Sequence, residues 1–335
     1  MSIETLEYLQ RNILVGFTET RGNAWHYRVD LQGEESNHYP GPVPEEDVNR
    51  RLFDWEAVER PVLVEHSPGD VSVVPGFKAI VHGETGHLFT IARPSYVIHQ
   101  YRTWLTEVLK TIVRESELRI GSAGVLRQGA RAFVMIQTPQ TLRSRSGLEL
   151  QPQILAATSH DSSLATTYKL VSTFVVCDNT LAIALAEKTR SYKTKHSMKS
   201  WFRLGEAHSA LNILASGSDL MVDFVDSLAD VSVTDAQWQE IVERLLPIKD
   251  EHKGNIRQKM LNKREAIDAM YRNDQRCAPW TGTALGAFQA FNTHELHIAG
   301  PDRNRFDRNF SRVISRIGEK RDVSTIDVIL TVARR

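Results

Sequence analysis

The sequence predicts an α+β fold: a largely antiparallel sheet from the N-terminal half, packed with and followed by a mainly helical C-terminal half. Valine-rich and alternating segments dominate up to about residue 178, and segments with helical periodicity dominate after it. Strands first and helices later argue against a doubly wound parallel sheet, in which the two alternate. With 335 residues, of which 41% are hydrophobic, the chain is long enough for a substantial core.

The N-terminal half is expected to hold most of the strands and two helices. Three acids after Pro44 suit the positive end of a short helix that runs to Trp55. Apolar residues at helical spacing predict a helix over 96–113 that covers a sheet. Alternation and turn signals predict strands at 24–31, 61–66, 70–82, 85–92, 150–160 and 167–177, and two more within 123–137 around a Gln128-Gly129 turn.

The C-terminal half is expected to be helical almost throughout. Asn179 is a good N-cap for a helix that starts at Thr180, and Ser197 can cap a second helix through Leu211. Helical periodicity continues over 217–231, 233–246, 256–271 and 284–296. We therefore divide the chain into an N-terminal helix or arm (1–20), a β-rich part (21–178) and a helical part with basic elements (179–335), which are also compatible with one integrated domain.

Charge is distributed in blocks, although the formal net charge is zero. Residues 30–60 hold nine acids against three bases, and residues 206–243 hold eight acids without a lysine or arginine. Asp219, Asp223, Asp226 and Asp230 follow one helical face in the second block. Any electrostatic function must therefore come from local patterning.

Compartment and cofactor signals are few. The two cysteines, Cys177 and Cys277, have no partner at zinc or CxxC spacing, which favours a reducing cytoplasm. No apolar stretch approaches the roughly 20 residues of a membrane helix. We therefore expect a soluble cytoplasmic protein with no membrane partner.

The segment 188–203 mixes cations with rings and contains no acid. Cations neutralise phosphates, and rings stack on bases of any sequence, so this composition is typical of single-strand binding. The alternative is a solvated surface that pairs with the acidic segment after it. The candidate residues are Lys188, Arg190, Tyr192, Lys193, Lys195, His196, Lys199, Trp201 and Arg203.

Two further basic elements lie in the same half. Four arginines at spacings of 3, 4 and 4 fall on one helical face, opposite an apolar face that includes Phe310 and Val313. Guanidinium groups on such a helix could hold phosphates, or could pair with acids elsewhere. The segment 252–276 carries seven bases against three acids. The arginine row consists of Arg305, Arg308, Arg312 and Arg316.

Catalytic signatures are weak. His294 and His297 lack the i, i+4 spacing of a zinc-binding HExxH helix. His160-Asp161 fits a turn better than an acid–base pair, and Cys177 fits a buried strand end better than a nucleophile. Phosphate-loop and dinucleotide glycine motifs are absent from the sequence. We therefore assign no catalytic residue, metal or cofactor.

An ordered series of motifs resembles the phage/plasmid-like protein family, a domain family of unknown function found mainly in bacteriophages and mobile elements. The resemblance spans roughly residues 20 to 300 and runs through Trp55, "ETGHLFTIARPSYVIHQ", "GVLRQGARAFVMI", "TSHDSSLATTY", "FVVCDNTLAIAL", "TKHSMKSWFRLGEA" and "GTALGAFQAFNTHEL". Glu84 stands where that family often has Asp, and Lys195 where it often has Arg. The resemblance implies a mobile-element context and no agreed activity.

The sequence favours a non-enzymatic binder of single-stranded nucleic acid. By analogy with the context that the resemblance implies, it would be an annealing protein of phage recombination in the bacterial host cytoplasm. Single-stranded DNA is the expected partner, and adjacent blocks of opposite charge suit a head-to-tail homo-oligomer. One alternative is an enzyme acting on nucleic acid or nucleotide through His160, Asp161, Asn179 and His196. Another is a host-interaction protein that uses its acidic surfaces.

Overall fold

The computed structural model describes residues 5–113, 119–137, 141–174, 180–181, 191–200, 218–300, 305–314 and 316–335. The predicted α+β class is confirmed, with antiparallel sheets mostly from the N-terminal half and helices mostly in the C-terminal half. The chain forms two compact units. The first comprises Met1–Pro139, Gln153–Leu170 and Lys188–Ser216, and the second comprises Gln140–Pro152, Val171–Glu187 and Gly217–Arg335.

Within the described residues, the larger sheet has eight strands. Its main order is β1 (Ile13–Val15), β5 (Ile120–Leu126), β6 (Arg131–Gln137), β8 (Glu149–Ser159), β9 (Thr166–Phe174) and β10 (Thr180–Leu181). In addition, β7 (Leu142–Arg143) pairs with β8, and β11 (Ser191–Thr194) pairs with β9. The predicted hairpin turn between β5 and β6 is present, with Gln128 at φ 55° and Gly129 at φ 88°.

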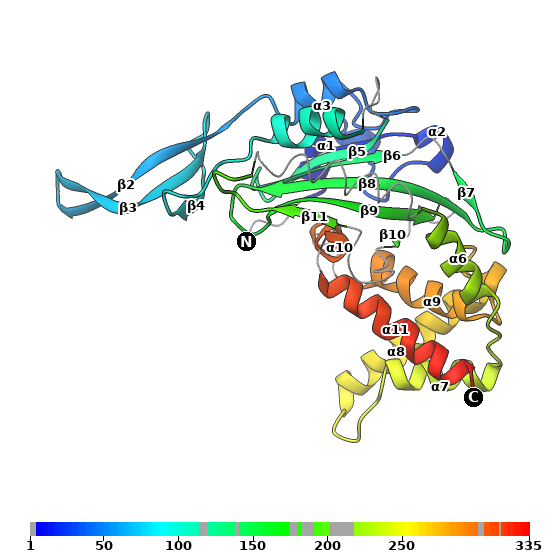
Figure 1. Ribbon diagram of the computed structural model, residues 1–335. Helices are drawn as coiled ribbons and strands as arrows, with labels where there is room; N and C mark the ends of the chain where they lie inside the picture. The colour runs from blue at the N-terminus through cyan, green and yellow to red at the C-terminus, as the bar shows by residue number, and fades with distance from the viewer. Residues whose placement is uncertain are drawn as a thin grey trace. The chain divides into compact units, whose positions relative to one another are not determined.

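Short helices cover this sheet within the first unit (Figure 1). They are α1 (Leu6–Asn12), α2 (Thr18–Arg21), α3 (Glu45–Arg51), a π-helical turn η2 (Arg102–Glu107) and α4 (Val108–Val113), besides a 3₁₀ turn η1 (Val29–Leu31). Trp104, Leu105 and Leu109 on η2 and α4 are buried. The predicted helix over 96–113 therefore exists but begins several residues later, because Pro94 to Gln100 connect it to a strand.

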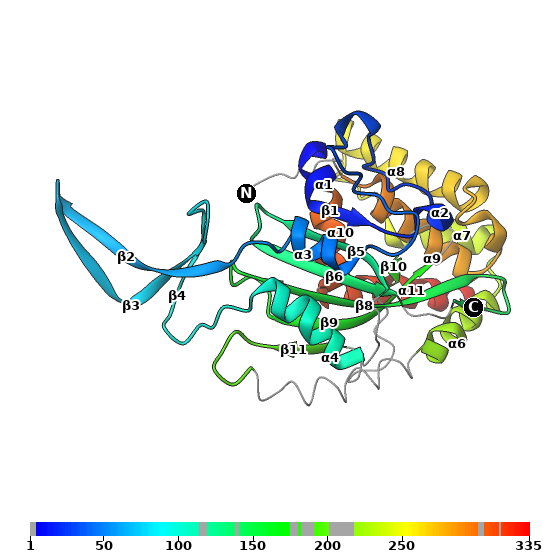
Figure 2. The same ribbon diagram turned by 90° about the horizontal axis from the view of Figure 1, so that it is seen from above.

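A second, three-stranded sheet belongs to the first unit. It has the order β2 (Ala57–Ser67), β3 (Asp70–His82) and β4 (Leu88–Ala92). Its small core consists of Ala57, Ile80 and Ala92, against which Trp55 and Phe89 pack. Beyond this core, β2 and β3 continue as a two-stranded ribbon that projects away from the rest of the first unit (Figures 1 and 2).

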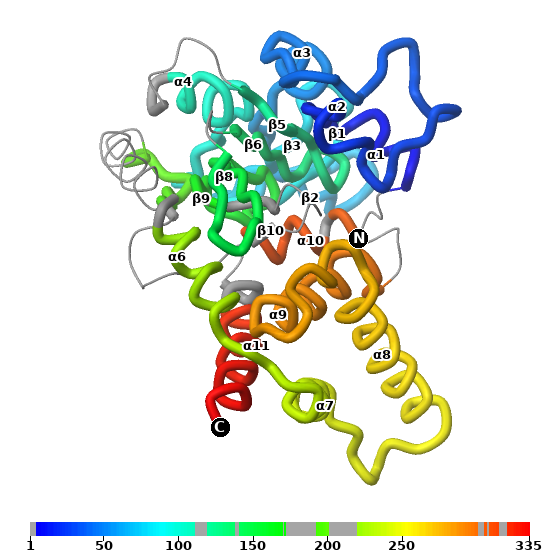
Figure 3. Tube along the Cα trace, turned by 90° about the vertical axis from the view of Figure 1, so that its right-hand side faces the viewer, coloured from blue at the N-terminus to red at the C-terminus, as the bar shows by residue number. Residues whose placement is uncertain are grey.

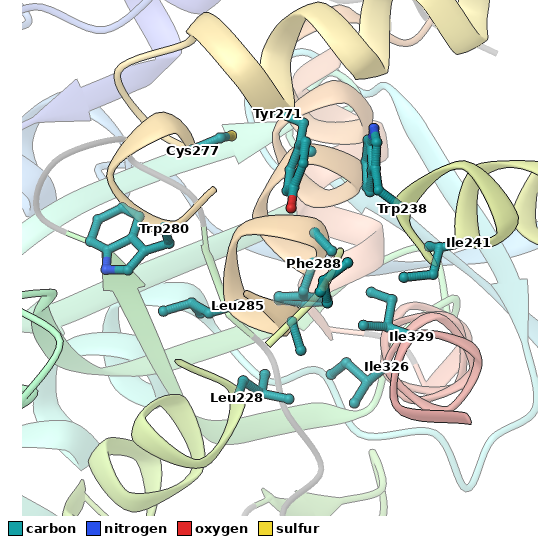
Figure 4. Close-up of a cluster of buried hydrophobic side chains, with 14 of the residues drawn as sticks. Leu228, Trp238, Ile241, Tyr271, Cys277, Trp280, Leu285, Phe288, Ile326 and Ile329 are labelled. Carbon is teal, nitrogen blue, oxygen red and sulfur yellow. The ribbon is translucent and has the colours of Figure 1, made fainter. Parts of the chain in front are cut away.

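The second unit is built from helices around one apolar core (Figures 3 and 4). Trp238 and Tyr271 stack with ring centroids 3.9 Å apart, and Trp238 donates a 2.7 Å hydrogen bond to Asp268. Phe288 and Ile329 complete the centre of this core. The elements are α6 (Ser218–Ala229), α7 (Asp235–Leu245), α8 (Gly254–Asn273), a 3₁₀ turn η4 (Ala278–Trp280), α9 (Ala284–Thr293), a π-helical turn η5 (His294–Ile298), α10 (Arg305–Ile314) and α11 (Arg316–Ala333).

Two local predictions are wrong. Residues 24–31 form turns and η1 instead of a strand, because the Gln10 side chain bonds the carbonyl of His26 and accepts from the backbone N–H of Arg28. Thr180–Leu181 form β10, paired with Ser172 and Thr173, where a helix was expected to start. Asn179, its expected N-cap, lies outside the described residues. Pairing of Thr180 and Leu181 with the preceding strand overrides the local helix preference there.

Candidate nucleic-acid interface

The basic segment enters the described structure as the edge strand β11, which lies between the two helices that the sequence predicts from Thr180 and from Ser197. Tyr192 pairs with Tyr168, and Thr194 pairs with Thr166. Among the described strands, β9 is the only one that pairs with β11. Thr194 is buried, whereas Lys193 and Lys195 on either side of it are exposed. Strand alternation therefore places both lysines on one open face, about 7 Å apart along the strand.

Three lysines of this segment are available for a ligand. Lys193, Lys195 and Lys199 are exposed, and none forms an ion pair with any residue that the structure describes. An exposed ammonium group without a carboxylate partner is free to contact a phosphate. The segment thus offers three cations over seven residues, on a strand edge and the turn that follows it.

His196 anchors this segment in the first unit. Its ring stacks on Tyr96 with centroids 4.9 Å apart and on His99 with centroids 4.1 Å apart. Nδ1 donates to the carbonyl of Val97 at 3.1 Å, so Nε2 accepts from the hydroxyl of Thr158 at 3.1 Å. Burial lowers the pKa of His196 to about 4, which keeps the ring neutral. His196 is therefore a positioning residue. The sequence suggested that its ring contacts a ligand, whereas in the structure the ring is engaged by Tyr96, His99, Val97 and Thr158.

His99 continues the same stack into the core. Its ring lies 3.8 Å from that of Trp104, and burial lowers its pKa to about 2. Nδ1 is 2.6 Å from the hydroxyl of Thr166, and Nε2 is 3.0 Å from the hydroxyl of Ser200. Ser200 ends the described part of the basic segment, so this bond fixes the segment at a second point. Sequence reasoning missed His99, because no local pattern links it to residues about a hundred positions away.

His160 and Asp161, two residues of the enzyme alternative, make contacts within the first unit. His160 is buried and stacks on Tyr101 at 4.0 Å, its Nδ1 has no hydrogen-bond partner among the described residues, and burial lowers its pKa to about 3. Asp161 faces Arg127 and Arg131 at 4.0 and 3.8 Å and accepts a 3.0 Å bond from the backbone of Ser163. Asn179 is not described. Across the described ranges, His, Cys, Asp and Glu form no group that could hold a metal ion.

The arginine row of α10 is largely committed to its own unit. Arg312 pairs with the buried Asp322 and donates to Asn292 at 3.3 Å. Arg308 donates to the carbonyl of Glu295 at 3.2 Å, and burial lowers its pKa. Phe310, Val313 and Ile314 are buried, as the apolar side of the predicted helix requires. Arg308 and Arg312 therefore make internal contacts. The sequence had suggested them as part of an open phosphate-binding face.

The acidic helix has a partner inside the second unit. Arg145 lies 3.4 Å from Asp226 and 2.9 Å from Asp230, and the backbone N–H groups of Arg145 and Ser146 also donate to Asp226. The alternative, in which this helix pairs with the basic segment, therefore finds no support at Asp226 and Asp230. The structure does not describe Lys188, Arg190, Trp201 or Arg203, nor the side chain of Arg316.

The fold and this edge define an α+β protein with a basic strand held by a stack of neutral histidines. The chain belongs to the family described as a domain of unknown function (DUF932), whose model matches residues 89–319. The expected membership of an uncharacterised domain family is thereby confirmed. No curated protein and no solved structure matches the chain. Within the described residues, no helix is long and apolar enough to cross a membrane.

Proposed function

We propose that this protein binds single-stranded nucleic acid, without catalysis or cofactor, along β11 and the turn that ends at Ser200. Its partner is single-stranded DNA, and its role is annealing in phage or mobile-element recombination, as a homo-oligomer in the cytoplasm of the bacterial host. The observation that carries the proposal is a set of three exposed cations on an anchored edge, none paired with an acid that the structure describes: Lys193, Lys195 and Lys199.

Anchoring supports binding for an energetic reason. A ligand site whose backbone is already ordered loses less conformational entropy on binding than a mobile loop does. His196 and Ser200 hold the segment through stacking and hydrogen bonds to the core. Lys193 and Lys195 then project from one strand face at the spacing of alternate strand residues, a regular row for successive phosphates. The aromatic contribution would come from Trp201, which the sequence places directly after Ser200.

Lysines on an edge strand have a second use. They can discourage edge-to-edge pairing between copies of a protein, a role that requires no ligand. The two roles differ in a measurable way, because only a phosphate-binding row gives retention of an oligonucleotide that weakens with salt.

The test is retention of a labelled single-stranded DNA oligonucleotide over a range of salt concentrations. Three phosphate contacts predict a slope of about −2 for log affinity against log salt, at about −0.7 per contact. Changing Lys193, Lys195 and Lys199 to alanine should flatten the slope by about 2 units. The matched control changes Lys253, Lys259 and Lys320 to alanine. These lysines are exposed, and the change removes the same amount of charge. Equal loss in both variants would contradict a localised site.

The same assay separates the alternatives. Turnover of the oligonucleotide with a divalent metal ion would favour an enzyme that acts on nucleic acid. If the oligonucleotide is neither retained nor turned over at low salt, the result would favour a host-interaction protein. The oligomeric state is measured independently by sedimentation velocity.

A further inference from the structure

The β2–β3 ribbon exposes several apolar side chains. Leu63 and Val73 are directly paired across the two strands and are 55% and 59% exposed. Val64, Val71 and Phe77 are exposed as well. Because paired residues share a face, Leu63 and Val73 form one apolar patch on the ribbon. We call residues 60–78 the arm.

The arm lacks the support that an isolated ribbon needs. A two-stranded hairpin is at best marginally stable in water without a third strand or a packed helix. The small core of this sheet ends at Ala57, Ile80 and Ala92, and β4 pairs with β3 only from Lys78 onward. The part of the arm beyond Pro61 would therefore gain stability from a partner surface that buries its apolar patch.

Charge along the arm identifies that partner. Its tip carries two exposed acids, Glu65 and Asp70, without a lysine or arginine between residues 61 and 77. Two exposed cations lie at its base: Arg60 of the arm itself, and Arg93 just after β4, which lies 4.3 Å over the ring of Phe77. Glu59 is neutralised there by Lys78. One end of the arm is therefore the electrostatic complement of the other end.

We propose that two copies of this chain pack their arms antiparallel around a two-fold axis. In such an isologous contact, the acidic tip of each arm meets the basic base of the other, and each pairing occurs twice. Leu63 lies midway between Arg60 and Ser67 on β2, so Leu63 and Val73 sit near the axis and pack on their counterparts. The acidic tip disfavours nucleic acid as the occupant.

Packing occurs through the faces of the arms. Pro61 has no N–H to donate and interrupts the outer edge of β2, which disfavours edge pairing. This inference rests on the homo-oligomer proposed above, to which the arm would supply a contact. The contact is two-fold symmetric, whereas the charge blocks in the sequence suggest head-to-tail assembly. DNA binding at β11 and pairing of the arms involve different residues, so they fail separately.

The first test is sedimentation velocity of the full chain over a range of concentrations. Wild type should dimerise, and the double change Leu63→Glu and Val73→Glu should weaken the dimer at least tenfold. The control is Val29→Glu with Ile256→Glu, two side chains that are 76% and 59% exposed outside the arm. Wild type that remains monomeric, or a dimer that survives the arm change, would overturn the proposal.

The second test reverses the charges at each end of the arm. The variants Glu65→Lys/Asp70→Lys and Arg60→Glu/Arg93→Glu should each be monomeric, because like charges then meet. An equimolar mixture should recover a heterodimer, which also shows that both variants fold. A mixture that stays monomeric excludes antiparallel pairing. Oligonucleotide retention is measured on the same samples. If a variant loses the dimer but still binds the oligonucleotide, or the reverse, the two proposals are tested separately.

Discussion

The ring of His196 lies nearly parallel to that of His99, with centroids 4.1 Å apart and an interplanar angle of 20°. Two imidazoles at this distance repel each other if both are protonated, so the stack is free of charge repulsion when both rings are neutral. Burial supplies that condition, since it lowers the pKa of both rings far below the ordinary value for histidine. The pair ties the basic segment to the core, so the protonation state of the stack determines how firmly the lysines of that segment are held.

Stability should therefore fall in mild acid. Histidines with a folded-state pKa of about 4 or lower bind protons in the unfolded state first, so their contribution is complete above the unfolded pKa of about 6.5. It is lost as the pH drops from about 6.5 toward 4, by up to about 1.4 kcal/mol per pH unit for each such histidine. Urea unfolding at a series of pH values measures this slope. A free energy of unfolding that stays constant from pH 7 to 5 would contradict it.

The two most buried histidines of this region should respond differently to substitution by phenylalanine. His99 bonds Thr166 and Ser200, so His99→Phe removes two buried hydrogen bonds and should cost about 1–3 kcal/mol, although Thr166 keeps its bond to Thr158 and Ser200 its bond to Ser197. His160 has an unpartnered Nδ1 and stacks on Tyr101, so His160→Phe should stay within about 1 kcal/mol of wild type at pH 7.

Both substitutions remove one buried histidine, and each should reduce the pH dependence of stability between pH 6.5 and 4. Each variant thus serves as the control for the other. If His160→Phe proved as damaging at pH 7 as His99→Phe, the ring of His160 would have a polar role that its contacts do not indicate.

Arg312 should matter for stability more than for DNA binding. Its partner Asp322 is buried, and removal of one member of a buried ion pair costs about 3–5 kcal/mol. Arg312→Met alone should therefore destabilise the chain strongly, whereas Arg312→Met combined with Asp322→Leu should recover most of the loss. Thermal unfolding measures stability, and oligonucleotide retention of the double variant measures binding. Lost binding in a stable double variant would return Arg312 to the nucleic-acid interface.

Much of the fold follows from local pattern. Helices predicted over 233–246 and 256–271 correspond to α7 and α8, and the turn at Gln128-Gly129 lies where it was expected. Local pattern fails where distant residues decide. β11 is a strand because it pairs with β9, and Arg312 is internal because Asp322 and Asn292 approach it. The exposure of the lysines on and after β11 follows from that pairing. The sequence therefore predicted which cations the segment contains, but not that they lie on one exposed face.

Stacking and charge should be separable on the proposed interface. Trp201→Ala should weaken oligonucleotide binding by about 1–3 kcal/mol, because one base loses its aromatic platform, and should leave the salt slope unchanged. The triple change at Lys193, Lys195 and Lys199 should instead flatten the slope, because fewer counterions are released. Titrations of both variants at three or more salt concentrations resolve the difference. A flat curve in wild type that survives the triple change would place the binding site on another part of the chain.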